Sequence, residues 1–195
     1  MCLHAKNSIK TADKDIKCYK ILQSLDGLRL EVPSFRLNIE KANGNEYLTP
    51  YLYFPMHLGE TYTDDEPFFH PYRDINGIAD IGSDYFHSFA TIEDAVEAIG
   101  DCEMSGAIVV ECVIPEGTKY FEGSMFYSEA KDGVVKTYAS KTLKLTNTIV
   151  AKTNCPAAES DILTLYYGGE EYRVIGGYTE AEKTFATYWI KVVNP

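Results

Sequence analysis

An unbroken apolar segment near the middle of the chain limits the possible folds more than any other feature of the sequence. Residues 106–114 are Gly-Ala-Ile-Val-Val-Glu-Cys-Val-Ile, and a Pro-Glu-Gly turn follows them. Side chains branched at Cβ are restricted in a helix and pack well on a pleated sheet, so the segment predicts a strand. Because the apolar run is continuous rather than alternating, we expect a central strand with both faces covered. Its buried residues should include Val109, Cys112 and Ile114.

One helix is predicted shortly before this strand, at about residues 91–99. Thr91 can cap its first turn, and Asp94 follows three residues later, as in a capping box. The apolar residues of the segment repeat at helical spacing and are Ala95, Val96 and Ile99. Gly100 is placed to end the helix in a left-handed conformation.

Shorter segments predict additional strands. Residues 17–22 are expected to form the first strand, and residues 120–121 to begin another. Residues 138–146 alternate as in a strand, with one face that carries Ala139, Lys141, Leu143 and Leu145.

The C-terminal part of the chain, residues 156–195, predicts a three-stranded meander. Two pairs, Gly168-Gly169 and Gly176-Gly177, can supply the positive φ angles of its turns. Three strands are too few to be stable alone, so we expect the meander to pack on the rest of the protein. The predicted organisation is an N-terminal arm (1–16), a main α+β domain (17–150) and the meander. The fold class is therefore α+β, with a predominantly antiparallel sheet and one main helix.

The charge of the chain disfavours two classes of partner. The 195 residues include 29 acidic and 18 basic side chains, for a formal net charge of −11 at pH 7. Binding to nucleic acid or to an anionic membrane depends on cationic side chains, so we expect neither partner. The five cysteines are scattered without a CxxC pair, and the N-terminus lacks the apolar core of a signal peptide. These features predict reduced thiols in a cytoplasm. The sequence has neither a GxGxxG nor a Walker A phosphate loop, and we expect no cofactor.

A long loop-rich region separates the first strand from the helix. Residues 43–85 are interrupted by Gly and Pro, and many of the aromatic residues of the chain lie between positions 47 and 72. Connections of this length are either packed against the protein or used for binding.

Five short motifs occur in a distinctive order within residues 1–150. They are Met1-Cys-Leu3, Asp15-Ile-Lys-Cys-Tyr-Lys20, Tyr85-Phe-His-Ser-Phe89, Val113-Ile-Pro-Glu-Gly-Thr-Lys-Tyr-Phe-Glu-Gly123 and Tyr138-Ala-Ser-Lys-Thr-Leu-Lys-Leu145. In this order they resemble small uncharacterised proteins of gut Bacteroidetes and their phages. The resemblance implies a phage or mobile element, and a location in the cytoplasm of a bacterium or phage-infected cell or on a virion. It implies no particular chemistry.

Three segments carry a second resemblance. Cys18–Leu22 corresponds to an early strand, His87-Ser-Phe-Ala-Thr91 to a strand ahead of a helix, and residues 138–145 to a later strand. In this order they resemble the ADP-ribosyltransferase fold, in which the later strand carries a catalytic Glu. Here that strand has Ser-Lys-Thr at 140–142, and a Lys cannot stabilise the positive charge that develops on the ribose. The resemblance therefore implies a related scaffold without the transferase activity.

The first two of these segments contain the candidate ligand-binding residues, which are Cys18, Tyr19, His87, Ser88 and Thr91. The start of a helix can hold a phosphate on its unbonded N–H groups, and a tyrosine can stack on a base. The structural alternative is that Ser88 and Thr91 serve as helix caps while His87 is a half-buried residue at a strand end.

Two other groups of residues are candidate sites. Removal of Met1 would make Cys2 an N-terminal nucleophile with its own amine as the base, and the alternative is an ordinary tail residue. His57, His70 and His87 could bind a metal together with nearby acidic residues, but their spacing matches no metal motif. We therefore expect no metal and no catalytic residue.

Two classes of function remain. The first is a non-catalytic protein-interaction module, such as a phage structural or accessory protein, that binds another protein through its aromatic loops and acidic surface. The second is a nucleotide-binding or small-molecule-binding protein on a degenerate ADP-ribosyltransferase-like scaffold. A convex surface with exposed tyrosines would favour the first class, and a deep cleft between strands near His87 would favour the second.

Overall fold

A computed structural model of the chain describes residues 3–5, 9–24, 46–50, 54–65, 79–81, 85–101, 104, 106–124, 135–154, 164–179 and 184–192. The elements within these residues, in chain order, are β1 (Leu3–Ala5), β2 (Lys10–Thr11), β3 (Ile16–Ser24), β4 (Glu46–Leu48), β5 (Pro55–His57), β6 (Thr61–Thr63), β7 (Ala79–Ile81), β8 (Phe86–Phe89), α1 (Ile92–Asp101), β9 (Ala107–Ile114), β10 (Lys119–Ser124), β11 (Lys136–Ser140), β12 (Thr142–Thr153), β13 (Thr164–Tyr167), β14 (Glu170–Thr179) and β15 (Thr184–Lys191).

All of these strands belong to one hydrogen-bonded sheet in which every described pairing is antiparallel. The order along the sheet is β15-β14-β13-β12-β9-β3-β8-β11-β10-β1-β7, and β2, β4, β5 and β6 pair with its members. With a single helix among the described residues, the protein is α+β and dominated by antiparallel sheet, which confirms the predicted class.

The central strand is β9, as the apolar run predicts. It pairs with β3 on one edge and with β12 on the other, so that Cys112 lies opposite Cys18 on one side and Leu145 on the other. Val109, Cys112 and Ile114 have no exposed surface.

Both faces of this central region are covered by packed side chains. Ile21 and Val109 belong to a core cluster that includes the apolar face of α1. Their neighbours Leu22 and Val110 belong to a second cluster, which also contains Leu143 and Leu145. Since successive residues of a strand point to opposite faces, one strand supplies both clusters.

The helix begins where the sequence predicts and ends later. The Asp94 amide donates a hydrogen bond to Thr91 Oγ1 (3.1 Å), so Thr91 is the N-cap. The predicted end at Gly100 is wrong: the helix continues to Asp101, and Gly100 is buried inside it. A hydrogen bond from the Met104 amide to the Ile99 carbonyl (3.0 Å) spans the helix end instead.

The single strand predicted over residues 138–146 is in fact two strands that meet at Lys141. Before it, β11 pairs with β8 and β10; after it, β12 pairs with β6 and β9. The Lys141 amide donates to the Lys119 carbonyl (3.3 Å), and Ser140 Oγ donates to the Thr142 carbonyl (2.9 Å). These bonds stabilise a change of partners that simple alternation does not predict.

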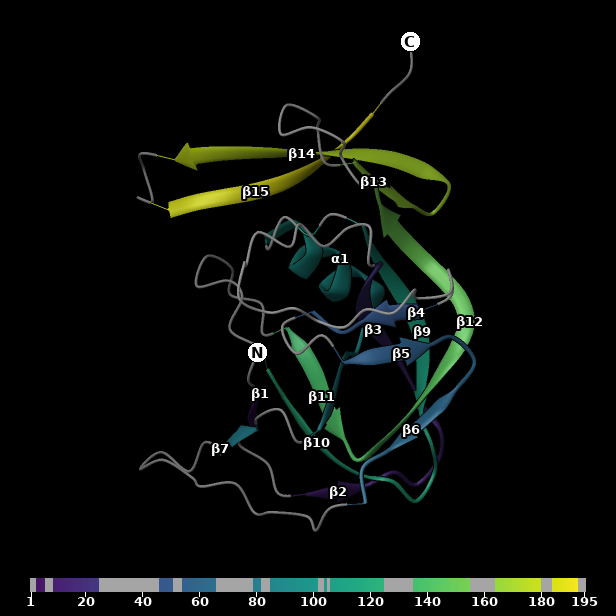
Figure 1. The fold of residues 1–195 in the computed structure, drawn as a ribbon. Coiled ribbons are helices and arrows are strands. Elements are labelled where there is room, and N and C mark those ends of the chain that lie inside the picture. The colour runs from purple at the N-terminus through teal and green to yellow at the C-terminus, as the bar shows by residue number, and fades with distance from the viewer. Residues whose placement is uncertain are drawn as a thin grey trace, which may run out of the picture.

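The C-terminal meander extends the main sheet through the pairing of β13 with β12. Its first turn is at Gly168 and Gly169, whose φ angles are 62° and 80°, as predicted. The second predicted turn is wrong, because Gly176 and Gly177 lie within β14, opposite β15. Figure 1 shows β12 as a long curved strand that carries the meander over α1, and α1 contacts both the central strands and β15.

Residues at the N-terminus, which we expected to form an arm, contribute two short strands to the sheet. β1 pairs with β10 and β7, and β2 pairs with β10. Ala5 and Ala12 are buried.

A substitution in β9 tests this arrangement. We expect Ile114→Ala to lower the free energy of unfolding by about 2–5 kcal/mol, because it removes buried methyl groups and leaves a cavity. The matched control is Ile149→Ala in β12, where the side chain is 41% exposed and its loss should cost less than about 1 kcal/mol. Urea denaturation followed by circular dichroism measures both. Equal losses in the two variants would contradict the central position of β9.

Candidate functional site

The structure divides the five predicted ligand-binding residues between two faces of the sheet. Cys18 and Ser88 lie together on one face, and neither has any exposed surface. Tyr19 packs on the opposite face, with the core cluster that contains its pairing partner Phe89. Thr91 caps α1, and His87 is half-buried in β8. Thr91 and His87 therefore have the positions of the structural alternative, whereas Ser88 is a buried residue of β8 and does not cap the helix.

A buried polar cluster lies where the site was predicted, and its principal member is Lys20. This side chain is on the same face of β3 as Cys18 and Leu22, and its Nζ donates a hydrogen bond to the His87 carbonyl (2.8 Å). Burial lowers the pKa of Lys20 to about 8, an effect that the nearby Cys112 and Cys18 thiols partly oppose. The alternation of Cys18, Lys20 and Leu22 in the sequence could have identified this buried lysine.

The two thiols of the cluster are poor nucleophiles in this environment. Burial raises the pKa of Cys18 to about 11, although contacts with the Ser88 hydroxyl and the Lys20 ammonium act in the opposite direction. Burial likewise raises the pKa of Cys112, and its Sγ donates to the Val110 carbonyl (3.4 Å). Because the thiolate is the reactive form, both cysteines act as core residues at neutral pH.

The buried ammonium predicts an unusual pH dependence of stability. In the unfolded chain the pKa of Lys20 is near 10.5, and in the folded protein it is about 8. Between these values the unfolded chain holds a proton that the folded protein has lost, so deprotonation stabilises the fold as pH rises. Relative to Lys20→Met, the wild type should gain on the order of 3 kcal/mol across this window.

Urea unfolding of both proteins at several pH values between 7 and 10 measures this gain. The comparison with Lys20→Met is needed because the Cys18 and Cys112 thiols lose their protons in the unfolded chain within this range but keep them in the folded protein, which lowers stability as pH rises. Lys144→Met, at an exposed position of β12, is the matched control for the loss of a lysine side chain. A difference between wild type and Lys20→Met that is constant with pH would contradict the lowered pKa.

Three lysines that the sequence places close together do not form a basic patch. Lys136 makes an ion pair with Glu122 (3.1 Å), which also pairs with Lys10. Lys141 pairs with Asp64 and lies over the ring of Tyr85, with Nζ 4.8 Å from the ring centroid. Lys144 is exposed on β12. Acidic side chains therefore neutralise two of the three charges.

The described part of the aromatic loop region packs against the protein. The rings of Phe54, Tyr62 and Phe86 form a cluster with centroids 6.1–6.5 Å apart. Tyr62 Oη donates to Glu60 Oε2 (3.0 Å) and accepts from the His57 amide (2.6 Å). Phe54 is 45% exposed, while Tyr62 and Phe86 are partly buried on the core. His70, part of the metal hypothesis, lies outside the described residues, within which no group of His, Cys, Asp and Glu side chains could hold a metal ion.

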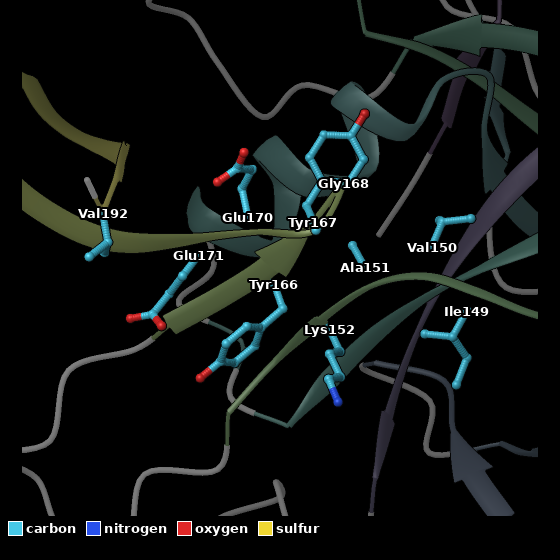
Figure 2. Close-up of a pocket in the computed structure, with 11 residues that line it drawn as sticks. Ile149, Val150, Ala151, Lys152, Tyr166, Tyr167, Gly168, Glu170, Glu171 and Val192 are labelled. Carbon is cyan, nitrogen blue, oxygen red and sulfur yellow. The ribbon is translucent and has the colours of Figure 1, made fainter. Parts of the chain in front are cut away.

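An open groove of about 630 Å³ lies where β12, β13 and β14 meet. Figure 2 shows that Ile149 and Lys152 from β12 border it on one side, and Tyr166 and Glu171 from the β13–β14 hairpin on the other. Ile149 is 41% exposed and Tyr166 is 42% exposed. Two large apolar side chains are thus left in contact with water in one concave surface.

The polar groups of the groove form a row across the sheet. Lys152 is paired with Tyr166, and Tyr166 with Glu171. The Lys152 ammonium lies 5.9 Å from the centroid of the Tyr166 ring. Next to Glu171 lies Val192, directly after β15. The Val192 amide donates a hydrogen bond to the Glu171 carbonyl (2.8 Å).

The opposite face of the same hairpin is fixed to the helix. Tyr167 Oη donates to Glu93 Oε1 in the first turn of α1 (2.9 Å), and this bond raises the pKa of Tyr167. Leu165 is buried in the core cluster beneath α1. Tyr166 and Glu171, which line the groove, therefore belong to a hairpin whose opposite face is held against α1.

Sequence reasoning did not identify this groove. Two signals were available: Ile149 follows three polar residues in a strand that otherwise buries its apolar residues, and Tyr166 directly precedes a tyrosine and a Gly-Gly turn. Neither signal shows that β12 and β13 are neighbours.

Comparisons of the chain with protein-family models, with curated proteins and with solved structures give no match. The described residues contain no helix that is both long and apolar enough to cross a membrane.

Proposed function

We propose that the protein is a non-catalytic protein-interaction module and that the groove between β12 and the β13–β14 hairpin is its binding surface. The observation that carries this proposal is the exposure of Ile149 and Tyr166 in one concave surface. Burial of such side chains by a partner is favourable, and tyrosine is among the residues that dominate binding energy at interfaces.

The surroundings of these two residues have the composition of a binding site. Lys152, Glu170 and Glu171 provide a polar rim around them, and hydrogen bonds at a rim give orientation. The bond between Tyr167 and Glu93 holds the hairpin in place before a partner arrives, so little conformational entropy is lost on binding.

The resemblance of residues 1–150 to phage and bacterial proteins suggests a role for this module. The motifs within residues 1–150 resemble proteins of gut Bacteroidetes and their phages, so we propose a phage structural or accessory protein whose partner is another protein. Its place would be the cytoplasm of a bacterium or infected cell, or a virion. The alternative, a nucleotide-binding or small-molecule-binding protein, lacks comparable support because Cys18 and Ser88 have no exposed surface.

Peptide selection tests the proposal without a known partner. A random twelve-residue library displayed on yeast is selected against the wild-type protein, and the enriched peptides are synthesised. We expect them to bind the wild type and to lose at least about tenfold in affinity on Tyr166→Ala, the size of effect typical of a central interface residue.

The matched control is Phe54→Ala, which removes another exposed aromatic ring outside the groove. The selected peptides should bind this variant as they bind the wild type, and urea unfolding should show that both variants are folded. Failure to enrich any peptide, or peptides that bind Tyr166→Ala as tightly as the wild type, would refute the proposed function.

A further inference from the structure

Two cysteines face each other across the central pair of strands. Cys18 of β3 lies directly opposite Cys112 of β9, and the register between these strands runs without a shift along the whole of β9. Both side chains belong to the second core cluster, so they lie on the same face of the sheet. Both are free thiols, and neither has any exposed surface. The other three cysteines of the chain lie outside the described residues.

The spacing of the two strands suits a disulfide bond between them. Residues directly opposite each other in an antiparallel pair have Cα atoms about 4.5–5.5 Å apart, and disulfides occur at Cα separations of about 4.4–6.8 Å. The regular pairing of β3 with β9 therefore already holds the two backbones at a suitable distance. Cys112 Sγ donates to the Val110 carbonyl (3.4 Å), and Cys18 contacts the Ser88 hydroxyl. Closure of a disulfide would replace only these weak contacts of the thiols.

The folded protein protects both thiols from exchange. Thiol–disulfide exchange needs a thiolate that reaches the sulfur of another disulfide. Burial raises the pKa of Cys18 and of Cys112, and packed side chains separate both sulfur atoms from solvent. In the unfolded chain the thiols are exposed and have an ordinary pKa near 9.0. Exchange with a small disulfide therefore takes place before the sheet is complete.

We propose that Cys18 and Cys112 form a redox device whose state is set while the chain folds. In the presence of oxidised glutathione or another small disulfide, the folding chain closes a disulfide between them. In a reducing solution it folds with two thiols. The completed sheet then preserves the state in which it formed. This device lies in the core and does not depend on the proposed binding groove.

The bond forms in two exchange steps. The thiolate of one cysteine attacks oxidised glutathione and releases one glutathione thiolate, which leaves a mixed disulfide on the protein. The thiolate of the other cysteine attacks the protein sulfur of this mixed disulfide and releases the second glutathione. Together the two cysteines lose two protons and two electrons, and the electrons reduce one oxidised glutathione to two molecules of glutathione.

Folding and the disulfide stabilise each other. The bond joins residues 94 positions apart in the chain, and a cross-link over such a long loop removes conformational freedom from the unfolded state. The paired strands place the two thiols opposite each other, whereas the unfolded chain seldom brings them together. Since the coupling is reciprocal, a bond that stabilises the fold must also form more favourably within it.

Refolding in glutathione buffers tests the proposal. Reduced wild-type protein in urea is diluted into native buffers with graded ratios of oxidised to reduced glutathione, and the disulfides are mapped by mass spectrometry after the free thiols are blocked. We expect a bond between Cys18 and Cys112, with an equilibrium constant at least about tenfold greater than in samples kept in urea. Equal constants, or a preference for bonds to Cys2, Cys102 or Cys155, would overturn the proposal.

Preservation of the state is tested on protein that has already folded. Wild type folded in reductant is transferred to oxidised glutathione in native buffer, where Cys18 and Cys112 should stay reduced at least about ten times longer than in urea. Closure of the bond at equal rates in the two solutions would refute preservation by the fold.

The matched control is Cys112→Ala, which keeps Cys18 and loses its partner. The disulfide form of the wild type should unfold at a higher urea concentration than the dithiol form, because the cross-link restricts the unfolded chain. The variant should show no such increase after the same oxidation. An unchanged midpoint in the oxidised wild type would show that the bond does not fit the fold. The peptide map of the wild type decides whether the bond forms even where the variant is poorly folded.

Discussion

The fold depends on the need to cover both faces of one apolar strand. β9 is apolar on both sides, and a strand of this kind is stable only when neighbours pair with both edges and side chains pack on both faces. β3 and β12 provide the edges, and the two core clusters provide the faces. α1 covers the first face together with the C-terminal hairpin. The second face is covered by residues from β3, β11 and β12 and by the short strands that the loop region contributes.

This double coverage explains why a lysine is found in the core. Position 20 of β3 faces the second cluster, between Cys18 and Leu22, so its side chain must pass through apolar surroundings. The His87 carbonyl accepts its hydrogen bond across the space between β3 and β8, strands that pair at Tyr19 and Phe89. A buried ammonium with one such bond is expensive, and its lowered pKa is the result. The cluster of Lys20, Cys18 and Ser88 has the residue types of a reactive site, but its burial and protonated thiols are those of a structural one.

The curvature of β12 connects the core to the proposed binding surface. Its two register shifts bend the strand, so that its first part pairs with β6 and its last part with β13 (Figure 1). The bend brings the hairpin over α1, where the contact between Tyr167 and Glu93 fixes it. The same bend separates β6 from β13 along one edge and turns Ile149 outward. The groove between β12 and the β13–β14 hairpin therefore depends on the same bend that carries the hairpin over α1.

Local sequence determined the elements of this protein, and the tertiary structure determined how they are combined. The continuous apolar run predicted β9, and the cap at Thr91 predicted the start of α1, because both signals depend on residues close together in the chain. The turn at Gly168-Gly169 was predicted for the same reason, whereas Gly176-Gly177 has an equal turn propensity and is held in β14 by pairing with β15. The break at Lys141 and the groove beside Tyr166 both depend on contacts between distant segments. Sequence patterns describe which residues prefer to be buried, but the choice of strand partners is decided by packing across the whole sheet. The proposed binding surface lies between β12 and the β13–β14 hairpin, which only that choice brings together.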